Sequence, residues 1–226
     1  MKTSKDDLPF WMYWGAQAYP RRSMTPAEPS REPHPAFIAC RMLLVLSLVT
    51  GLIYPLVVTG IAKVALRRTA SGSIVLRDGQ PVGSELLAQR FAAAKYFWPR
   101  PSAGDDGTNY VAVPSSASNL GPTSSNLMAL VRARADQFRA AHGLPDNATV
   151  PPDMLFASGS GLDPHISPAS ARLQIQRVAQ ARHYDAATTE RLRQLVEQSV
   201  EPPQLGFLGE PRVNVLHLNL TLDQLQ

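Results

Sequence analysis

MLLVLSLVTGLIYPLVVTGIA, residues 42–62, decides the architecture of this chain. The stretch is 21 residues long and contains no charged side chain. A helix rises about 1.5 Å per residue, so a helix of this length spans a hydrocarbon core of about 30 Å. No second uncharged apolar run of this length occurs in the 226 residues. We therefore expect one transmembrane helix near the N-terminus, in a chain whose near-zero mean hydropathy suggests a soluble protein.

A cleaved signal peptide is the alternative for this stretch. The apolar part of a signal peptide is usually about 7–15 residues long and lies close to the N-terminus. This run is longer, follows about 40 residues, and has no convincing small-residue cleavage site behind it. We expect an uncleaved helix over residues 36–66, a disordered tail over 1–35 and one compact domain over 67–226.

The N-terminal tail is rich in proline and polar residues, which favours disorder. Two alternatives remain open. The aromatic cluster Phe10, Trp11, Tyr13 and Trp14 is also typical of a segment that rests in a membrane interface. Translation beginning at Met24, or nearer the apolar run, would remove part of the tail.

The charges are unevenly distributed. Residues 1–68 carry nine Lys/Arg and four Asp/Glu, whereas residues 69–226 carry thirteen and fourteen. The larger part lacks the broad basic face that binds duplex nucleic acid, so nucleic-acid binding is excluded. The single cysteine, Cys40, excludes an internal disulfide and a zinc site built on paired thiolates, and no histidine pair with ligand spacing replaces them.

Local patterns predict a small α+β domain with short strands at both ends and about three helices between them. The expected strands are 73–77, turned by Asp78-Gly79 into 80–82, and the alternating leucines of 216–222. The expected helices are 84–91 and, after a long loop, 125–142, 167–182 and 188–199. The inward side chains predicted for these helices are Leu127, Leu130, Val131, Phe138, Ile175, Val178, Ala179, Leu192, Leu195 and Val196.

Small residues recur along the apolar run. Ser47, Gly51, Pro55 and Thr59 follow one another at intervals of four, and Thr50 and Tyr54 adjoin them on the helix surface. Such a stripe lets a second helix approach closely within a membrane, so we expect these six residues to face a partner. The alternative is that Gly and Pro are simply tolerated in membrane helices.

The stretch from Ala157 to Ser167 is rich in serine and glycine. Its backbone can form an anion-binding concavity, with Ser158, Gly159, Ser160 and Gly161 as the candidate phosphate or nucleotide contacts. The lysine and Ser/Thr that close a P-loop are missing, and a turn leading into a helix cap is the simpler interpretation.

Asp163 and His165, with a nearby serine, suggest a hydrolase. The glycine spacing of a nucleophile elbow is absent, however, and a structural histidine is the favoured interpretation. No catalytic residue and no metal ligand is expected.

Several longer motifs resemble one family, the C subunit (KdpC) of the bacterial Kdp-type potassium-transporting ATPase. The matching stretches cover residues 40–226 and include, in chain order, Thr50-Gly51, Tyr54-Pro55, Thr59-Gly60, Gly83-Ser84, Tyr96 through Ala103, Ser118 through Pro122, Ala157 through Pro168, Gln176 through Ala179 and Gly206 through Leu216. Residues 1–35 have no counterpart, because family members usually begin just before the span.

The resemblance implies a non-catalytic subunit of a high-affinity, ATP-driven potassium import complex. Its partners are a channel-like A subunit, a P-type B subunit that hydrolyses ATP and a small F subunit, together with membrane lipid. The C subunit is needed for assembly and acts as a chaperone-like factor that raises the ATP affinity of the B subunit. No cofactor is expected on this chain; ATP and potassium are handled by the complex.

The resemblance also implies a single-pass protein of the bacterial inner membrane whose C-terminal domain is extracytoplasmic. Flanking charge favours the opposite orientation, because Lys63, Arg67, Arg68 and Arg77 follow the span and fewer basic residues precede it. Long domains are translocated largely regardless of such charges. The alternative function is a free, membrane-anchored binding protein whose Ser/Gly loop holds an anion or nucleotide.

Overall fold

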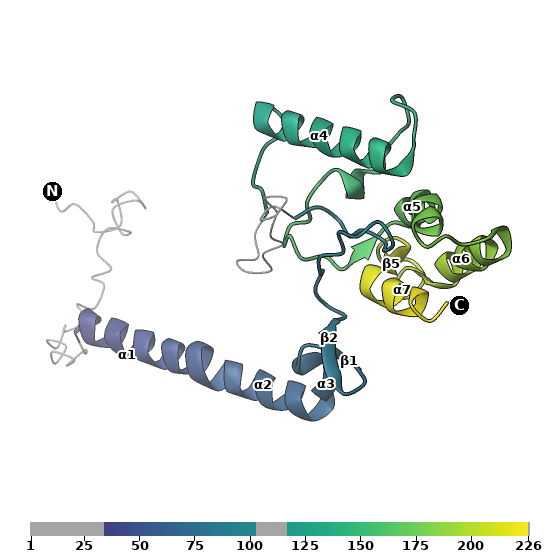
Figure 1. Ribbon diagram of the computed structural model, residues 1–226. Coiled ribbons are helices and arrows are strands. Elements are labelled where there is room, and N and C mark those ends of the chain that lie inside the picture. The colour runs from purple at the N-terminus through teal and green to yellow at the C-terminus, as the bar shows by residue number, and fades with distance from the viewer. Residues whose placement is uncertain (1–33, 103–116, 226) are drawn as a thin grey trace, which may run out of the picture. The chain divides into compact units, whose positions relative to one another are not determined.

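The computed structural model describes residues 34–102 and 117–225 (Figure 1). The chain divides into two compact units, residues 1–57 and 58–226, and each is considered by itself. Within the described ranges one continuous helical run of 31 residues, 35–65, is long and apolar enough to cross a membrane. It comprises α1 (Pro35–Leu48), the π-helical turn η4 (Val49–Ile53) and α2 (Tyr54–Ala65). The predicted N-terminal apolar helix is confirmed.

The π turn sits where the sequence disturbs an ordinary helix. Pro55 has no N–H and cannot donate to the carbonyl of Gly51, four residues earlier. A turn that contains extra residues, such as this π-helical turn, is commonly found where a helical hydrogen bond is missing. The Thr50 hydroxyl also donates to the carbonyl of Leu46 at 2.7 Å, a bond that often bends helices.

A β-hairpin begins the second unit's sheet structure. Strands β1 (Ile74–Arg77) and β2 (Gln80–Ser84) pair antiparallel, as expected. Asp78 and Gly79 have φ of +52° and +77°, which fits the type I′ turn that this dipeptide favours. A short helix, α3 (Arg67–Ala70), precedes the hairpin.

The helix predicted over 84–91 is wrong. Ser84 ends β2, and its hydroxyl donates to the carbonyl of Gly72 at 2.7 Å. Farther on, the N–H of Ala88 donates to the carbonyl of Leu162 at 2.9 Å. These bonds hold the segment against distant parts of the chain, and a helix would have to break them.

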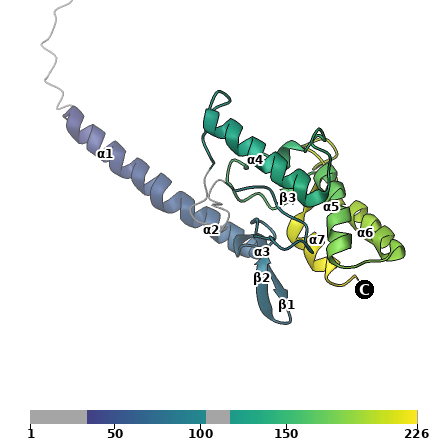
Figure 2. The ribbon, with the colours of Figure 1, turned by 45° about the horizontal axis from the view of Figure 1, so that its top comes forward.

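The three longer helices of the domain form close to the predicted ranges 125–142, 167–182 and 188–199. They are α4 (Ser125–His142), α5 (Pro168–Ala181) and α6 (Ala186–Gln198), capped by the side chains of Ser124, Ser167 and Asp185. Helix α5 packs against both α4 and α6 (Figure 2). A 3-10 turn, η5 (Pro152–Met154), connects α4 to the segment before α5.

Burial confirms the inward faces of α5 and α6 better than that of α4. Helix α4 buries Ala135, Phe138 and His142 near its C-terminal end, whereas Leu130 is 43% exposed and Leu127 and Val131 are half-buried. The inward face predicted for the first two turns of α4 is therefore not part of the described core.

The strand predicted over 216–222 is wrong, because these residues form the helix α7 (Val215–Leu222). Strand β5 (Arg212–Asn214) ends just before it and lies between β3 (His165–Ile166) and β4 (Val200–Glu201) in an antiparallel sheet. The Asn214 side chain caps α7 by accepting the N–H of His217 at 3.2 Å. The α+β class is confirmed.

The core contains a loop held by two side-chain carboxamides. Asn219 of α7 accepts the N–H of Phe97 at 2.8 Å and donates to its carbonyl at 2.9 Å. Gln174 of α5 does the same for Trp98, at 2.7 and 3.2 Å. Both amides and Phe97 are almost fully buried. The two side chains thus take the place of neighbouring strands.

We expect Asn219→Leu to lower the free energy of unfolding by roughly 2–4 kcal/mol, because it leaves a buried N–H and a buried carbonyl of Phe97 unpaired. Asn126→Leu, at an exposed position of α4, is the matched control and should change stability little. Denaturant unfolding of the detergent-solubilised chain measures both. Equal effects of the two substitutions would contradict the role given to Asn219.

Candidate functional site

The motif from Tyr96 to Ser102 presents its aromatic and basic side chains to different neighbours. The guanidinium carbon of Arg177 lies 4.1 Å from the centre of the Trp98 ring, and His142 meets this ring edge-on at 5.3 Å. Arg177 donates from Nε to Nε2 of His142 at 2.9 Å and from its terminal nitrogens to Gln174 and the carbonyl of Ala94. Trp98 of this motif therefore covers one face of a buried cation.

Arg177 is only 6% exposed, and none of the ion pairs among the described residues includes it. Burial lowers its pKa to about 10, which still leaves it charged at neutral pH. The guanidinium group of Arg177 is surrounded by neutral hydrogen-bond acceptors and the face of the Trp98 ring, and not by a carboxylate. A buried charge held in this way is sensitive to any change in its neighbours.

His142 is the neighbour whose state can change. Its Nδ1 lies 2.7 Å from the carbonyl of Phe138, so the proton is assigned to Nδ1 and Nε2 accepts from Arg177. Burial lowers the pKa of His142 to about 4, the positive charge of Arg177 acts in the same direction, and the bond to Phe138 opposes them. His142 is therefore neutral at physiological pH.

Arg100 connects the motif from Tyr96 to Ser102 with the serine- and glycine-rich stretch from Ala157 to Ser167. It donates to a carboxylate oxygen of Asp163 at 2.8 Å and to the carbonyl of Phe156 at 3.4 Å. Burial raises the pKa of Asp163, but hydrogen bonds from His165 and Arg100 outweigh it and lower the pKa to about 2. An acid this strong is a poor general base, and Asp163 instead joins the two segments.

The Ser/Gly loop turns back on itself. The N–H of Leu162 donates to the Ser160 hydroxyl at 3.1 Å, and that of Asp163 to the Ser158 hydroxyl at 3.4 Å. Gly161 has a φ of +70°, and its N–H donates to the carbonyl of Ser158 at 3.2 Å. Beyond this turn lies the Ser167 cap that the sequence predicts. Anion binding by Ser158–Gly161 stays a prediction.

His165 faces the acid beside it. Its Nδ1 lies 3.2 Å from Asp163, and its backbone N–H donates to the same carboxylate at 3.0 Å. This arrangement is the structural role that we favour from the sequence.

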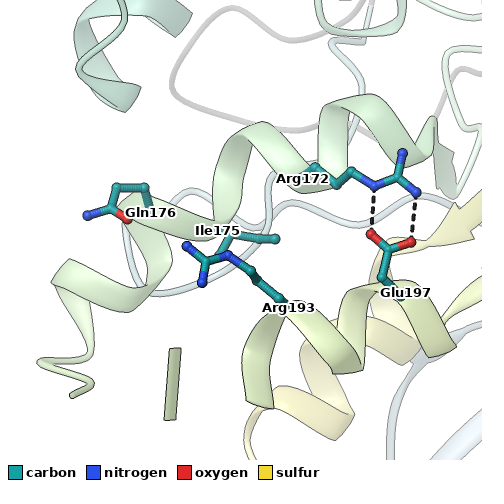
Figure 3. A pocket seen from close by; sticks show the side chains of 5 residues that line it. All are labelled: Arg172, Ile175, Gln176, Arg193 and Glu197. Atoms are coloured by element: carbon teal, nitrogen blue, oxygen red, sulfur yellow. Dashed lines mark hydrogen bonds and ion pairs between the residues drawn. The ribbon is translucent and has the colours of Figure 1, made fainter. Parts of the chain in front are cut away.

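Two hollows are open on the described surface. One of about 390 Å³ lies beside the motif and combines guanidinium groups with apolar side chains, among them Arg90, Arg100, Arg134, Trp98, Phe138 and Met154. Another of about 250 Å³ lies between α5 and α6 (Figure 3). There Arg172 makes two hydrogen bonds to Glu197, at 2.6 and 2.7 Å, between side chains that are both half exposed. Such a surface pair contributes little to stability.

The residues predicted to face a partner all lie in the apolar helix. All six residues are exposed, and their positions are Ser47 in α1, Thr50 and Gly51 in η4, and Tyr54, Pro55 and Thr59 in α2. The residues missed from the sequence are Gln174, Arg177, His142 and Asn219. Arg177 lies in the matching stretch Gln176 through Ala179. For the other three, a polar residue at a position where the helical period favours an apolar one is the signal that could have found them.

We expect the free energy of unfolding to fall as the pH drops from about 6.5 towards 4. Over this range the unfolded chain protonates His142 while the folded chain does not, so protons favour unfolding. The shift corresponds to about 3 kcal/mol at most. His142→Gln keeps an acceptor for Arg177 and should remove this pH dependence, whereas His183→Gln, at an exposed site, should retain it. Parallel curves for His142→Gln and the unmodified chain would refute the assignment.

The comparisons with known proteins agree with one another. The family described as the K+-transporting ATPase, c chain, matches residues 36–224. The Potassium-transporting ATPase KdpC subunit of Mycobacterium tuberculosis is 49% identical over 187 residues, covering 83% of this chain and 96% of the relative. The proteins of the same name from Cereibacter sphaeroides and Gemmatimonas aurantiaca are 51% and 52% identical over 185 residues, covering 82% and 81% of this chain and 94% and 89% of theirs.

The match runs from the apolar helix to α7 and so includes both the stripe and the motifs joined by Arg100 and Asp163. The similarity is too high and too extensive to reflect the fold alone. This chain belongs to the KdpC family, the c chain of the K+-transporting ATPase.

Proposed function

We propose that this chain is a non-catalytic subunit needed to assemble a high-affinity, ATP-driven potassium import complex of the bacterial inner membrane. The observation that carries the proposal is the apolar helix. In its most apolar 18-residue window, no residue is buried against the rest of the described chain. A surface of this length and composition is stable only in contact with lipid or with other apolar helices. Residues 36–66 then serve as the anchor, 67–226 as the domain and 1–35 as a tail.

The π turn improves the alignment of the stripe. In an α-helix residues four apart are offset by about 40°, because each residue advances about 100°. From Ser47 to Thr59 this drift would add up to about 120°. A π turn contains more residues and takes back part of the drift between Ser47 and Pro55. The small residues are thereby kept closer to one face, where a second helix can approach.

Membership in this family supports a place among the subunits of a potassium ATPase, and we assign the partners on that basis. The stripe docks on the helices of the channel-like A subunit, with the P-type B subunit and the small F subunit in the same complex. The chain acts on the B subunit as a chaperone-like factor that raises its affinity for ATP. It supplies no phosphorylated aspartate of its own.

The second candidate function is direct contact with an anion or nucleotide at Ser158–Gly161. The observation that favours it is Arg100, which holds this loop through Asp163 and also lines the arginine-rich hollow. The two candidate functions require the domain to lie on opposite sides of the membrane. An extracytoplasmic domain acts on the B subunit without touching cytosolic ATP, whereas direct nucleotide contact requires the domain in the cytoplasm.

We expect the double substitution Gly51→Leu and Pro55→Leu to release the chain from the complex, because bulky side chains prevent a close helix approach. The measurement is copurification of the large subunits in mild detergent, with potassium-stimulated ATP hydrolysis as a second readout. The KM for ATP should rise in the complex that has lost this chain. Gly60→Leu, at a glycine off the stripe, is the control. Unchanged copurification of the double variant would count against the proposal.

We expect the domain to be accessible from outside the cell. A single cysteine placed by Gln194→Cys on the exposed face of α6, in a Cys40→Ser background, should react in intact spheroplasts with a maleimide that cannot cross the membrane. Labelling only after lysis would place the domain in the cytoplasm, as flanking charge favours. That result would support the second candidate function.

A further inference from the structure

A tight turn after β4 exposes large apolar side chains to water. Leu205 is 82% exposed, Phe207 75% and Leu208 49%, and we call these three residues the apolar tip. Among the described residues outside the helix 35–65, Leu205 and Phe207 are the two most exposed large apolar side chains. The surrounding stretch, residues 202–209, contains no charge. The apolar tip is thus a concentrated apolar feature on a polar domain.

The backbone of this turn is fixed. Gln204 and Leu208 exchange two hydrogen bonds, each of 2.9 Å, from N–H to carbonyl. Leu205 and Gly206 are the first two of the three residues between them and have φ of +53° and +81°. With the N–H of Phe207 donating to the carbonyl of Gln204 at 3.3 Å, this is the pattern of a type I′ turn over residues 204–207. Asn and Gly suit these positions, while leucine in the left-handed region is strained. Leu205 is therefore held in a backbone conformation that does not suit leucine, and its apolar side chain extends into solvent.

Strain of this kind, held by surrounding hydrogen bonds, is a feature of functional positions. A fixed geometry matters for fitting a protein pocket, whereas a fluid lipid surface does not require it. Charge also disfavours lipid. Glu210 beside the tip is exposed and takes part in none of the ion pairs of the described residues, while Arg212 is paired with Glu201 at 3.0 Å. The unpaired charge here is negative, and an anionic membrane would repel it.

We propose that the apolar tip docks into an apolar pocket with a basic rim on another subunit of the potassium-transporting ATPase. Leu205 and Phe207 fill the pocket, and the carboxylate of Glu210 meets the basic rim. This inference rests on the proposed function, because it requires a complex in which such a subunit is present. It assigns the domain a contact of its own, separate from the stripe in the apolar helix.

The decisive variant is Leu205→Asn in the full chain, coexpressed with the other subunits. Asparagine suits the turn, so the melting temperature of the purified subunit should stay the same or rise. Retention of the large subunits after a detergent wash should nevertheless fall at least fivefold. Phe207→Ser and Glu210→Arg should also weaken retention, and Phe207→Leu should preserve most of it. Leu76→Asn, at an exposed leucine of β1, is the control and should leave retention unchanged.

Each other outcome counts against the proposal. Retention at the unmodified level for both Leu205→Asn and Phe207→Ser overturns it, and so does a loss of retention that follows a loss of stability. In reconstituted vesicles, brominated lipid can quench tryptophan fluorescence. Stronger quenching in a Phe207→Trp variant than in the unmodified chain overturns the proposal in favour of a membrane contact. If the unmodified chain copurifies with no other subunit, the proposed function is overturned as well. If the unmodified chain copurifies with the other subunits and the variants do so equally well, only the proposed role of the apolar tip is overturned.

Discussion

Two buried carboxamides determine how the domain is built. The backbone at Phe97 and Trp98 crosses the core without a strand beside it, and unpaired amides there would be costly. Asn219 and Gln174 satisfy these groups from two helices that are far apart in the sequence. Each amide carries an NH2 donor and a carbonyl acceptor side by side, which is why a side chain can replace a strand. Once this backbone is fixed, the side chains that follow have fixed directions as well.

The consequences reach both sides of the segment. Trp98 is placed over Arg177, and Arg100 extends to Asp163 in the Ser/Gly loop. The buried guanidinium in turn shares Gln174 with the backbone of Trp98, so the cation and the loop hold each other in position. A carboxylate in this place would compensate the charge more fully, but it could not also donate to a backbone carbonyl. The neutral amide therefore serves two partners, and the remaining contacts of Arg177 come from His142, a carbonyl and an aromatic ring.

Sequence reasoning succeeded where short-range chemistry decides the structure. The Asp78-Gly79 turn and the cap at Ser167 are such cases, because each depends on residues within one turn. It failed over 216–222, where Leu216, Leu218, Leu220 and Leu222 alternate like a strand but Val215, Leu218 and Leu222 also share a helical face. The capping amide of Asn214 and the bonds of Asn219 to Phe97 favour the helix, and the second of these depends on a contact 122 residues apart. The candidate site was found only in part for the same reason: the motifs were visible, but the residues that hold them lie elsewhere in the chain.

Among the places where the described residues depart from local preference, two are exposed and apolar. At the π turn the helix departs from its regular hydrogen bonding beside Gly51 and Pro55, and after β4 Leu205 adopts a backbone conformation that suits asparagine or glycine. Inside the domain, by contrast, the buried amides and the buried cation have partners that explain them. Departures from local preference that bring no gain within the chain are expected where the gain comes from a partner. The buried polar groups of the domain therefore hold its own fold, and the exposed apolar surfaces are the ones that we propose other chains or lipid cover.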